Sequence, residues 1–146
     1  MNRYFLIFFT LILGFSSCNE DEDTSENNLL FGEWLQIEII KSDGSLLELN
    51  ECQLQETIEF RVNGNLIRKN WAGAIPCEYS NLIHHFEIND DIFIVSQGAL
   101  DGETFIVKNR ILTINDTTLK FEIIYSSLSG NIPEGERLSW VYTKIE

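Results

Sequence analysis

From Leu30 to the end of the chain, apolar and polar residues alternate in short runs that are separated by small or amide residues. Alternation with a period of two places successive side chains on opposite faces of a β-strand, so each run predicts a strand that is buried on one face. No stretch sustains the period of a helix, which excludes a parallel α/β fold. Short strands joined by tight turns predict an all-β, antiparallel fold, either an up-and-down barrel or a β-sandwich.

The alternating runs define where strands are expected. They are Glu33–Lys41, Glu56–Val62, Asn65–Trp71, Asn81–Ile88, Asp91–Ser96, Glu103–Val107, Arg110–Ile114, Thr118–Tyr125 and Leu138–Ile145. Clean alternation also assigns faces, since Ile58, Phe60 and Val62 share one apolar face. A second apolar face is expected along Leu119–Tyr125.

The amino terminus has a basic residue, Arg3, followed by the nearly uniformly apolar run Tyr4–Phe15. This order is typical of a secretory signal peptide. A transmembrane helix needs about 20 apolar residues, and this run is shorter and meets charged residues soon after it ends. We therefore expect residues 1–17 to be a signal peptide that is removed.

The residues Phe15-Ser16-Ser17-Cys18 resemble the lipobox of bacterial lipoproteins. The resemblance implies cleavage before Cys18 and diacylation of that cysteine, whereas an ordinary signal peptide with an incidental cysteine is the alternative. Two or three acyl chains would anchor the protein stably in a membrane. Residues 18–28 would then be the lipidated cysteine and a flexible acidic tether, because Asn19 to Asn28 include no apolar side chain.

The acidic run after Cys18 is also similar to the surface-export signals of some gram-negative lipoproteins, although a solvated spacer has the same composition. The expected location is therefore the outer membrane of the cell envelope, with exposure at the cell surface left open. The expected membrane contact is through the lipid on Cys18.

Two cysteines, Cys52 and Cys77, remain in the part of the chain after the tether. In an exported protein such a pair is expected to form a disulfide. The dipeptide Asn63-Gly64 predicts a two-residue hairpin turn, in which Val62 pairs with Asn65. That register places Cys52 opposite position 75, close to Cys77, so the geometry also favours the bond. Two buried free thiols are the alternative.

Charge and motifs exclude several classes of function. The formal charge of -13, from 23 acidic and 10 basic residues, opposes binding to nucleic acid. The sequence contains no P-loop, nucleophile-elbow, Cys-x-x-Cys or zinc-protease motif. The two histidines, His84 and His85, are adjacent, so a strand would point them to opposite faces, away from a shared metal. We therefore expect no enzymatic activity, no cofactor and no metal site.

Several short motifs after the tether follow one another in a characteristic order. They are Gly32-x-Trp34, the segment Cys52–Asn65 with its hairpin turn, Cys77, the strand Thr118–Ile123 and a final Tyr142-x-Lys144. Together they are similar to the lipocalin-like domains of small bacterial lipoproteins. The resemblance implies an eight-stranded up-and-down barrel over residues 29–146, closed at one end by Trp34, with Lys144 packed over the indole ring.

The interior of so small a barrel either fills with its own side chains or holds one small ligand. The expected interior residues are mostly large and apolar: Ile58, Phe60, His84, Phe86, Phe121, Tyr125 and Trp140. A cavity of about 300 Å³ or more among them would favour binding of a small hydrophobic or amphipathic ligand. A filled interior would favour a packed barrel that serves as a non-enzymatic interaction or envelope-assembly module.

Overall fold

The computed structural model describes residues 29–72, 76–98 and 103–145. Its elements are β1 (Gly32–Ile40), η1 (Gln53–Gln55), β2 (Thr57–Phe60), β3 (Asn65–Ala72), β4 (Glu78–Asn89), β5 (Ile92–Gly98), β6 (Thr104–Ile114), β7 (Thr118–Ser126), β8 (Gly130–Asn131), η2 (Glu134–Glu136) and β9 (Ser139–Lys144). The expected signal peptide, lipidation site and tether lie outside the described residues. Among the described residues, no helix is long and apolar enough to cross a membrane.

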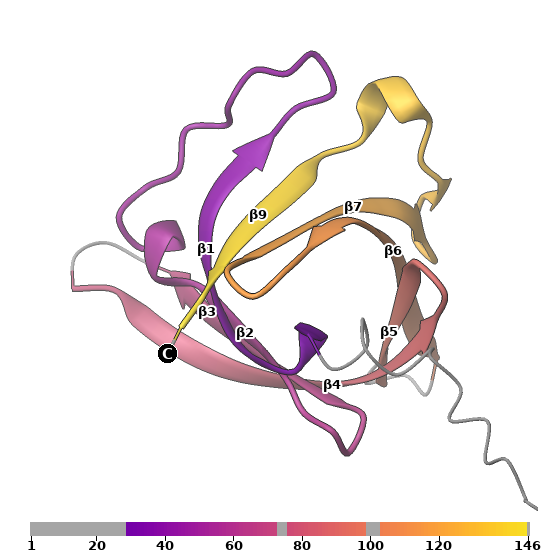
Figure 1. Ribbon diagram of the computed structural model, residues 1–146, viewed down its shortest axis with the longest axis horizontal. Helices are drawn as coiled ribbons and strands as arrows, with labels where there is room; N and C mark the ends of the chain where they lie inside the picture. Colours follow the sequence, from indigo (N-terminus) through magenta and orange to yellow (C-terminus); the bar gives the residue numbers. More distant parts are fainter. Residues whose placement is uncertain (1–28, 73–75, 99–102, 146) are drawn as a thin grey trace, which may run out of the picture.

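The strands form one antiparallel sheet that closes into a barrel (Figure 1). Each strand from β1 to β6 pairs with the next along the chain, and β9 closes the ring by pairing with both β7 and β1. The remaining strand, β8, has two residues and pairs with the end of β7. Closure gives hydrogen-bond partners to the backbone N–H and C=O groups that the edge strands of an open sheet would leave unpaired. The predicted eight-stranded up-and-down barrel is therefore confirmed, and the β-sandwich is excluded.

The hairpin between β2 and β3 has a three-residue loop, whereas the sequence predicted a two-residue turn. Arg61 N donates to Asn65 O at 2.9 Å, and Gly64 N donates to Arg61 O at 3.0 Å. Gly64 has a φ of 79°, as in a type I turn followed by a G1 bulge. The predicted pairing of Val62 with Asn65 was therefore wrong, and Val62 is 83% exposed in the loop.

This one-residue difference decides which side chains of β3 face the interior. Phe60, which is buried, pairs with Leu66. Paired residues share a face and side chains alternate along a strand, so Leu66 and Arg68 point inward. The predicted register would have turned Ile67 and Lys69 inward instead.

Strand β6 is continuous, although the sequence predicted two strands, Glu103–Val107 and Arg110–Ile114. The predicted break contains Asn109, which is 4% exposed. Its Nδ2 donates to Phe93 O at 3.4 Å, so the amide has a partner inside the barrel. The two residues left out of the predicted strands therefore continue the alternation of β6, with Asn109 facing inward and Lys108 outward.

A β-bulge in β7 changes the face predicted for Tyr125. Asn109 pairs with Ile123, but the preceding Lys108 pairs with Tyr125, which leaves Ile124 as the extra residue. Tyr125 therefore shares the outer face of Lys108, whose Nζ lies 5.2 Å from the centroid of its ring. The predicted apolar face along Leu119–Tyr125 ends at Ile123.

One end of the barrel is closed around Trp34, which is fully buried. Its Nε1 donates to Leu30 O at 2.8 Å. Lys144 Nζ lies 4.9 Å from the centroid of the indole ring and donates to Leu29 O at 3.1 Å. Gly32 has a φ of 122°, and a Cβ at this position would lie only 3.1 Å from Lys144 Cε. Glycine thus leaves room for the lysine to lie over the tryptophan.

Edge-to-face aromatic contacts form the core above this closed end. The ring of Phe60 lies 5.1 Å from that of Phe86 and 5.4 Å from that of Phe93. Phe93 in turn lies 5.0 Å from Phe121, again nearly perpendicular. Such pairs stabilise a core beyond the area they bury. They hold β2, β4, β5 and β7 around one aromatic layer.

Replacing Lys144 with Met tests the closed end. The variant keeps most of the side-chain volume but loses the cation–π contact and the hydrogen bond to Leu29 O. We expect a loss of about 1–2 kcal/mol in the free energy of unfolding, measured by urea titration. Lys41→Met, at an exposed lysine after β1, is the matched control and should be nearly neutral. Equal losses for the two variants would contradict the assignment.

Candidate functional site

A cavity of about 220 Å³ lies inside the barrel. Its lining residues come from every strand between β2 and β7 and from β9: Ile58, Phe60, Leu66, Arg68, Leu82, His84, Phe93, Val95, Gln97, Phe105, Val107, Asn109, Phe121, Ile123, Trp140 and Tyr142. Phe86 and Leu119, which are buried in the core, are not part of this lining. The cavity therefore begins where the aromatic layer of the core ends.

Three near-parallel rings form one aromatic wall of the cavity. The planes of Phe121 and Trp140 differ by 13° with their centroids 6.1 Å apart. The planes of Phe121 and Tyr142 differ by 12° with their centroids 5.5 Å apart. These residues lie on the neighbouring strands β7 and β9, where Phe121 pairs with Trp140. These stacked rings give one side of the cavity an aromatic surface.

A charged side chain, Arg68, also lines the cavity. Its Nη2 donates to Glu56 Oε2 at 3.1 Å, and Glu56 is not among the lining residues. The side chain of Arg68 is 42% exposed whereas that of Glu56 is 13% exposed. Arg68 therefore lines the cavity while it remains partly exposed, and its carboxylate partner is more buried.

Tyr142 connects the cavity to the polar interior near β1. Its hydroxyl donates to Gln36 Oε1 at 3.4 Å, and Gln36 Nε2 donates to Gln53 O at 3.3 Å. Burial raises the pKa of the Tyr142 hydroxyl, so the group remains a neutral hydrogen-bond donor. This chain of contacts holds the segment η1 against the barrel wall.

His84 lies in the cavity lining, and its Nδ1 is buried with no hydrogen-bond partner. Burial lowers the pKa of the imidazole below its ordinary value, and the positive charge of Arg68 lowers it further. His84 is therefore neutral at physiological pH. The adjacent His85 faces outward, where its Nε2 lies 3.8 Å from Glu87 Oε1.

The cavity contains some of the residues that the sequence predicted for the interior. Ile58, Phe60, His84, Phe121 and Trp140 line it. Phe86 lies in the core against Phe60, and Tyr125 lies outside the lining because of the bulge at Ile124.

Sequence reasoning did not find the polar residues Arg68, Gln97, Asn109 and Tyr142 of the cavity. One signal was present, because the final alternation places Tyr142 on the same face as Trp140. Arg68 had no such signal. Both faces of β3 carry an aliphatic and a basic residue, so the pattern alone does not say which face points inward.

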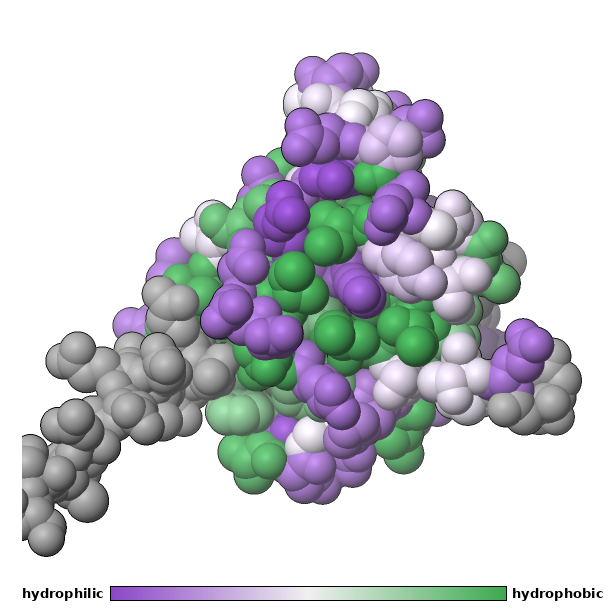
Figure 2. Space-filling view, turned by 90° about the vertical axis from the view of Figure 1, so that its right-hand side faces the viewer, coloured by the Kyte–Doolittle hydropathy of each residue, from purple (hydrophilic) through white to green (hydrophobic). Residues whose placement is uncertain are grey.

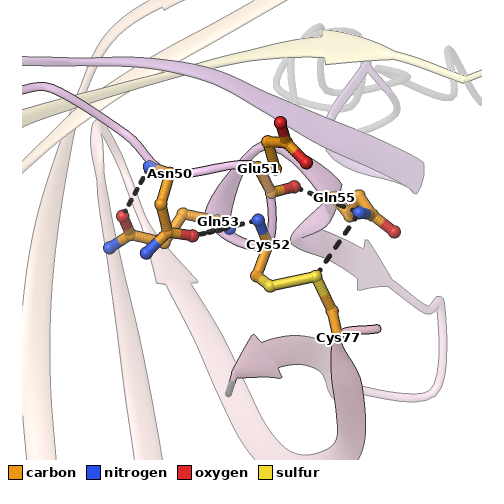
Figure 3. The surroundings of a disulfide bond; sticks show 6 residues. All are labelled: Asn50, Glu51, Cys52, Gln53, Gln55 and Cys77. Carbon is orange, nitrogen blue, oxygen red and sulfur yellow. Dashed lines mark hydrogen bonds between the residues drawn. A yellow bond between two sulfur atoms is a disulfide. The ribbon is translucent and has the colours of Figure 1, made fainter. Parts of the chain in front are cut away.

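The predicted disulfide between Cys52 and Cys77 is confirmed, with a Cα–Cα distance of 5.6 Å (Figure 3). Asn50 Oδ1 accepts hydrogen bonds from the backbone N–H groups of Cys52 and Gln53, both at 2.9 Å. Gln55 Nε2 lies 3.7 Å from Cys77 Sγ on the other side of the bond (Figure 3). The disulfide thus fixes η1, which supplies the acceptor for Gln36 and leads directly into Glu56.

The outer face of the barrel is more mixed in hydropathy than the mostly apolar lining of the cavity. On the side where β5 and β6 lie at the right of Figure 1, hydrophobic residues are interspersed with hydrophilic ones (Figure 2). Arg110 on β6 lies 3.7 Å from both Asp91 and Glu122. Among the described residues, no group of three or more His, Cys, Asp or Glu side chains is placed to hold a metal ion. The cavity is therefore the candidate site.

The closed barrel with one capped end and an internal cavity has a lipocalin-like β-barrel fold, and comparison with solved structures supports this. A lipocalin-like protein from Bacteroides uniformis is similar over 80% of this chain and 99% of its own, with a TM-score of 0.55 and 10% identity. An uncharacterized protein from Bacteroides eggerthii is similar over the same shares, with a TM-score of 0.51 and 12% identity. No family model matches the sequence, and no curated protein matches it significantly. At these identities the likeness shows a shared fold.

Reduction of the disulfide tests its contribution to stability. The bond closes a loop with a sequence separation of 25, which in the chain-entropy model contributes about 3 kcal/mol. We expect the free energy of unfolding of the oxidised protein to exceed that of the reduced protein by this amount in urea titrations. The double variant Cys52→Ser/Cys77→Ser is the control and should not respond to reductant. An unchanged midpoint on reduction of the native chain would contradict the prediction.

Proposed function

We propose that this protein is a non-enzymatic binding protein that holds one small hydrophobic or amphipathic molecule inside its barrel. The observation that carries the proposal is the solvent-connected cavity, in which apolar and aromatic side chains surround a few polar groups. Small-molecule sites generally have this composition, because apolar walls supply affinity and isolated polar groups fix the orientation.

The size of the cavity limits the ligand. A volume of about 220 Å³ is smaller than the cavity of about 300 Å³ or more that was expected to favour ligand binding, which is the lower end of the range for drug-sized molecules. It exceeds the roughly 150 Å³ of an apolar cavity that accepts benzene. The proposed ligand is therefore compact, with one or two rings, and a long acyl chain or a macrocycle would not fit without displacing the core.

Titration with a neutral two-ring molecule, 2-naphthol, tests the proposal. We expect saturable binding by calorimetry and a change in tryptophan fluorescence, because Trp140 lines the cavity. Val107→Phe extends an inward side chain into the cavity and should weaken binding by about tenfold or more. Ile106→Phe, one residue earlier on β6 and on the outer face, is the matched control. If 2-naphthol fails to bind, or if both variants weaken it equally, the cavity is not the site.

The proposal includes a lipid anchor on Cys18 that holds the protein at the outer membrane. It is supported by the order of a basic residue, a short apolar run, small residues and a cysteine, and by the acidic spacer that follows. The barrel would then present its cavity beside the membrane while its acidic surface discourages contact with anionic headgroups.

Mass spectrometry of protein extracted from membranes tests the anchor. We expect acyl mass on a peptide that begins at Cys18, and we expect Cys18→Ala to shift the protein from the membrane fraction to the soluble fraction. Ser25→Ala, within the expected tether, is the control and should leave the protein in the membrane fraction. A soluble mature form of the native chain without acyl mass would refute the anchor and leave the barrel proposal intact.

A further inference from the structure

The charged and polar side chains that line the cavity are cationic or neutral. Among the described residues of the lining, Arg68 carries the permanent charge, and none has a carboxylate. The other polar side chains are His84, Gln97, Asn109 and Tyr142, of which the Tyr142 hydroxyl already donates to Gln36 and Asn109 Nδ2 to Phe93 O. A lining that has one guanidinium and no carboxylate is complementary to an anionic group on a ligand.

Arg68 has donors that the protein does not use. Within the described part of the chain, the guanidinium makes one hydrogen bond, from Nη2 to Glu56 Oε2 at 3.1 Å. A guanidinium has five N–H donors in a planar fork that matches the two oxygens of a carboxylate. Because Glu56 lies outside the lining and the guanidinium is partly exposed, the remaining edge of Arg68 is accessible from the cavity.

His84 supplies a second, independent indication. Its Nδ1 is buried without a partner, although its residue lines the same cavity as Arg68. Buried polar atoms are nearly always hydrogen-bonded, so this nitrogen has an unmet hydrogen bond beside the cavity, which a ligand that shifts the ring can meet. The residue is close enough to Arg68 for the guanidinium charge to act on it.

We infer, as an extension of the proposed function, that the ligand is a small planar aromatic acid, bound with its carboxylate at Arg68 and His84 and its ring against the wall of Phe121 and Trp140. His84 takes up a proton when the acid binds. The carboxylate completes the hydrogen bonds of both side chains, and the aromatic wall excludes water from the ring.

Proton uptake follows from the charges around His84. In the free protein burial and the positive charge of Arg68 keep the imidazole neutral, and Arg68 itself is hydrogen-bonded to Glu56. Gln97 on β5 and Tyr142 on β9 face the cavity as neutral groups. A bound carboxylate raises the pKa of His84 because an adjacent negative charge favours the imidazolium. Affinity should therefore rise as the pH falls from about 8 to about 6, a range in which an aromatic acid with a carboxyl pKa near 4 stays ionised.

The test compares 2-naphthoic acid with 2-naphthamide, which has the same rings and no charge. We expect the acid to bind the purified protein about tenfold more tightly than the amide at pH 6. Calorimetry in two buffers of different ionisation enthalpy should show proton uptake with the acid and none with the amide. His84→Gln keeps a hydrogen-bond donor and should remove the proton uptake while it preserves a preference for the acid.

Two further variants separate charge recognition from folding. Glu56→Gln removes the internal competitor for Arg68 and should strengthen binding of the acid but not of the amide. Glu56→Gln/Arg68→Met removes both charges together, which avoids an unpaired buried carboxylate, and should abolish the preference for the acid. Circular dichroism and 2-naphthol binding confirm that each variant is folded with an intact cavity.

The outcomes distinguish this inference from the function on which it rests. If 2-naphthol and the amide bind but the acid binds no better, the anion site is wrong and the binding function stands. A preference for the acid that survives Glu56→Gln/Arg68→Met would also overturn the assignment to Arg68. If none of the three probes binds, both proposals fail.

Discussion

Burial of Phe60 is the constraint on which the arrangement of the cavity depends. Its ring contacts Phe86 and Phe93 edge to face, and its strand partner is Leu66. This pairing sets the register of β2 against β3, because a shift of one residue would turn the apolar ring out of the core. The same register carries Arg68 to the inner face of β3. A core contact therefore selects the charged residue that the candidate site presents.

The two ends of the barrel have different physical roles. At the closed end, Leu30 O accepts the indole N–H of Trp34, Lys144 lies over the ring, and aromatic side chains fill the adjacent space. Beyond the aromatic layer, inward side chains from seven strands do not meet, and the cavity remains. The disulfide and the contacts from Gln53 through Gln36 to Tyr142 brace this side of the barrel.

The sequence-based predictions failed where the backbone departs from regular pairing. Asn63-Gly64 correctly indicated a hairpin, but its three-residue loop and G1 bulge moved Val62 out of the core and reversed the expected faces of β3. The bulge at Ile124 likewise turned Tyr125 to the outer face. Each error is a shift of one residue, and a period of two converts such a shift into a change of face. Pattern analysis cannot see these shifts, since an extra residue leaves the alternation on either side intact.

The sequence by itself determined the strand-rich antiparallel barrel and the pairing of Cys52 with Cys77, and it separated His84 from His85 on opposite faces. These properties depend on local periodicity, turn residues and cysteine number, all of which are read along the chain. Only the tertiary structure decided that a cavity exists, how large it is, and that Arg68 and His84 face it together. Those properties depend on how side chains from distant strands meet across the barrel. The volume left between them is set by the packing of all these side chains together, so no single segment of the sequence encodes it.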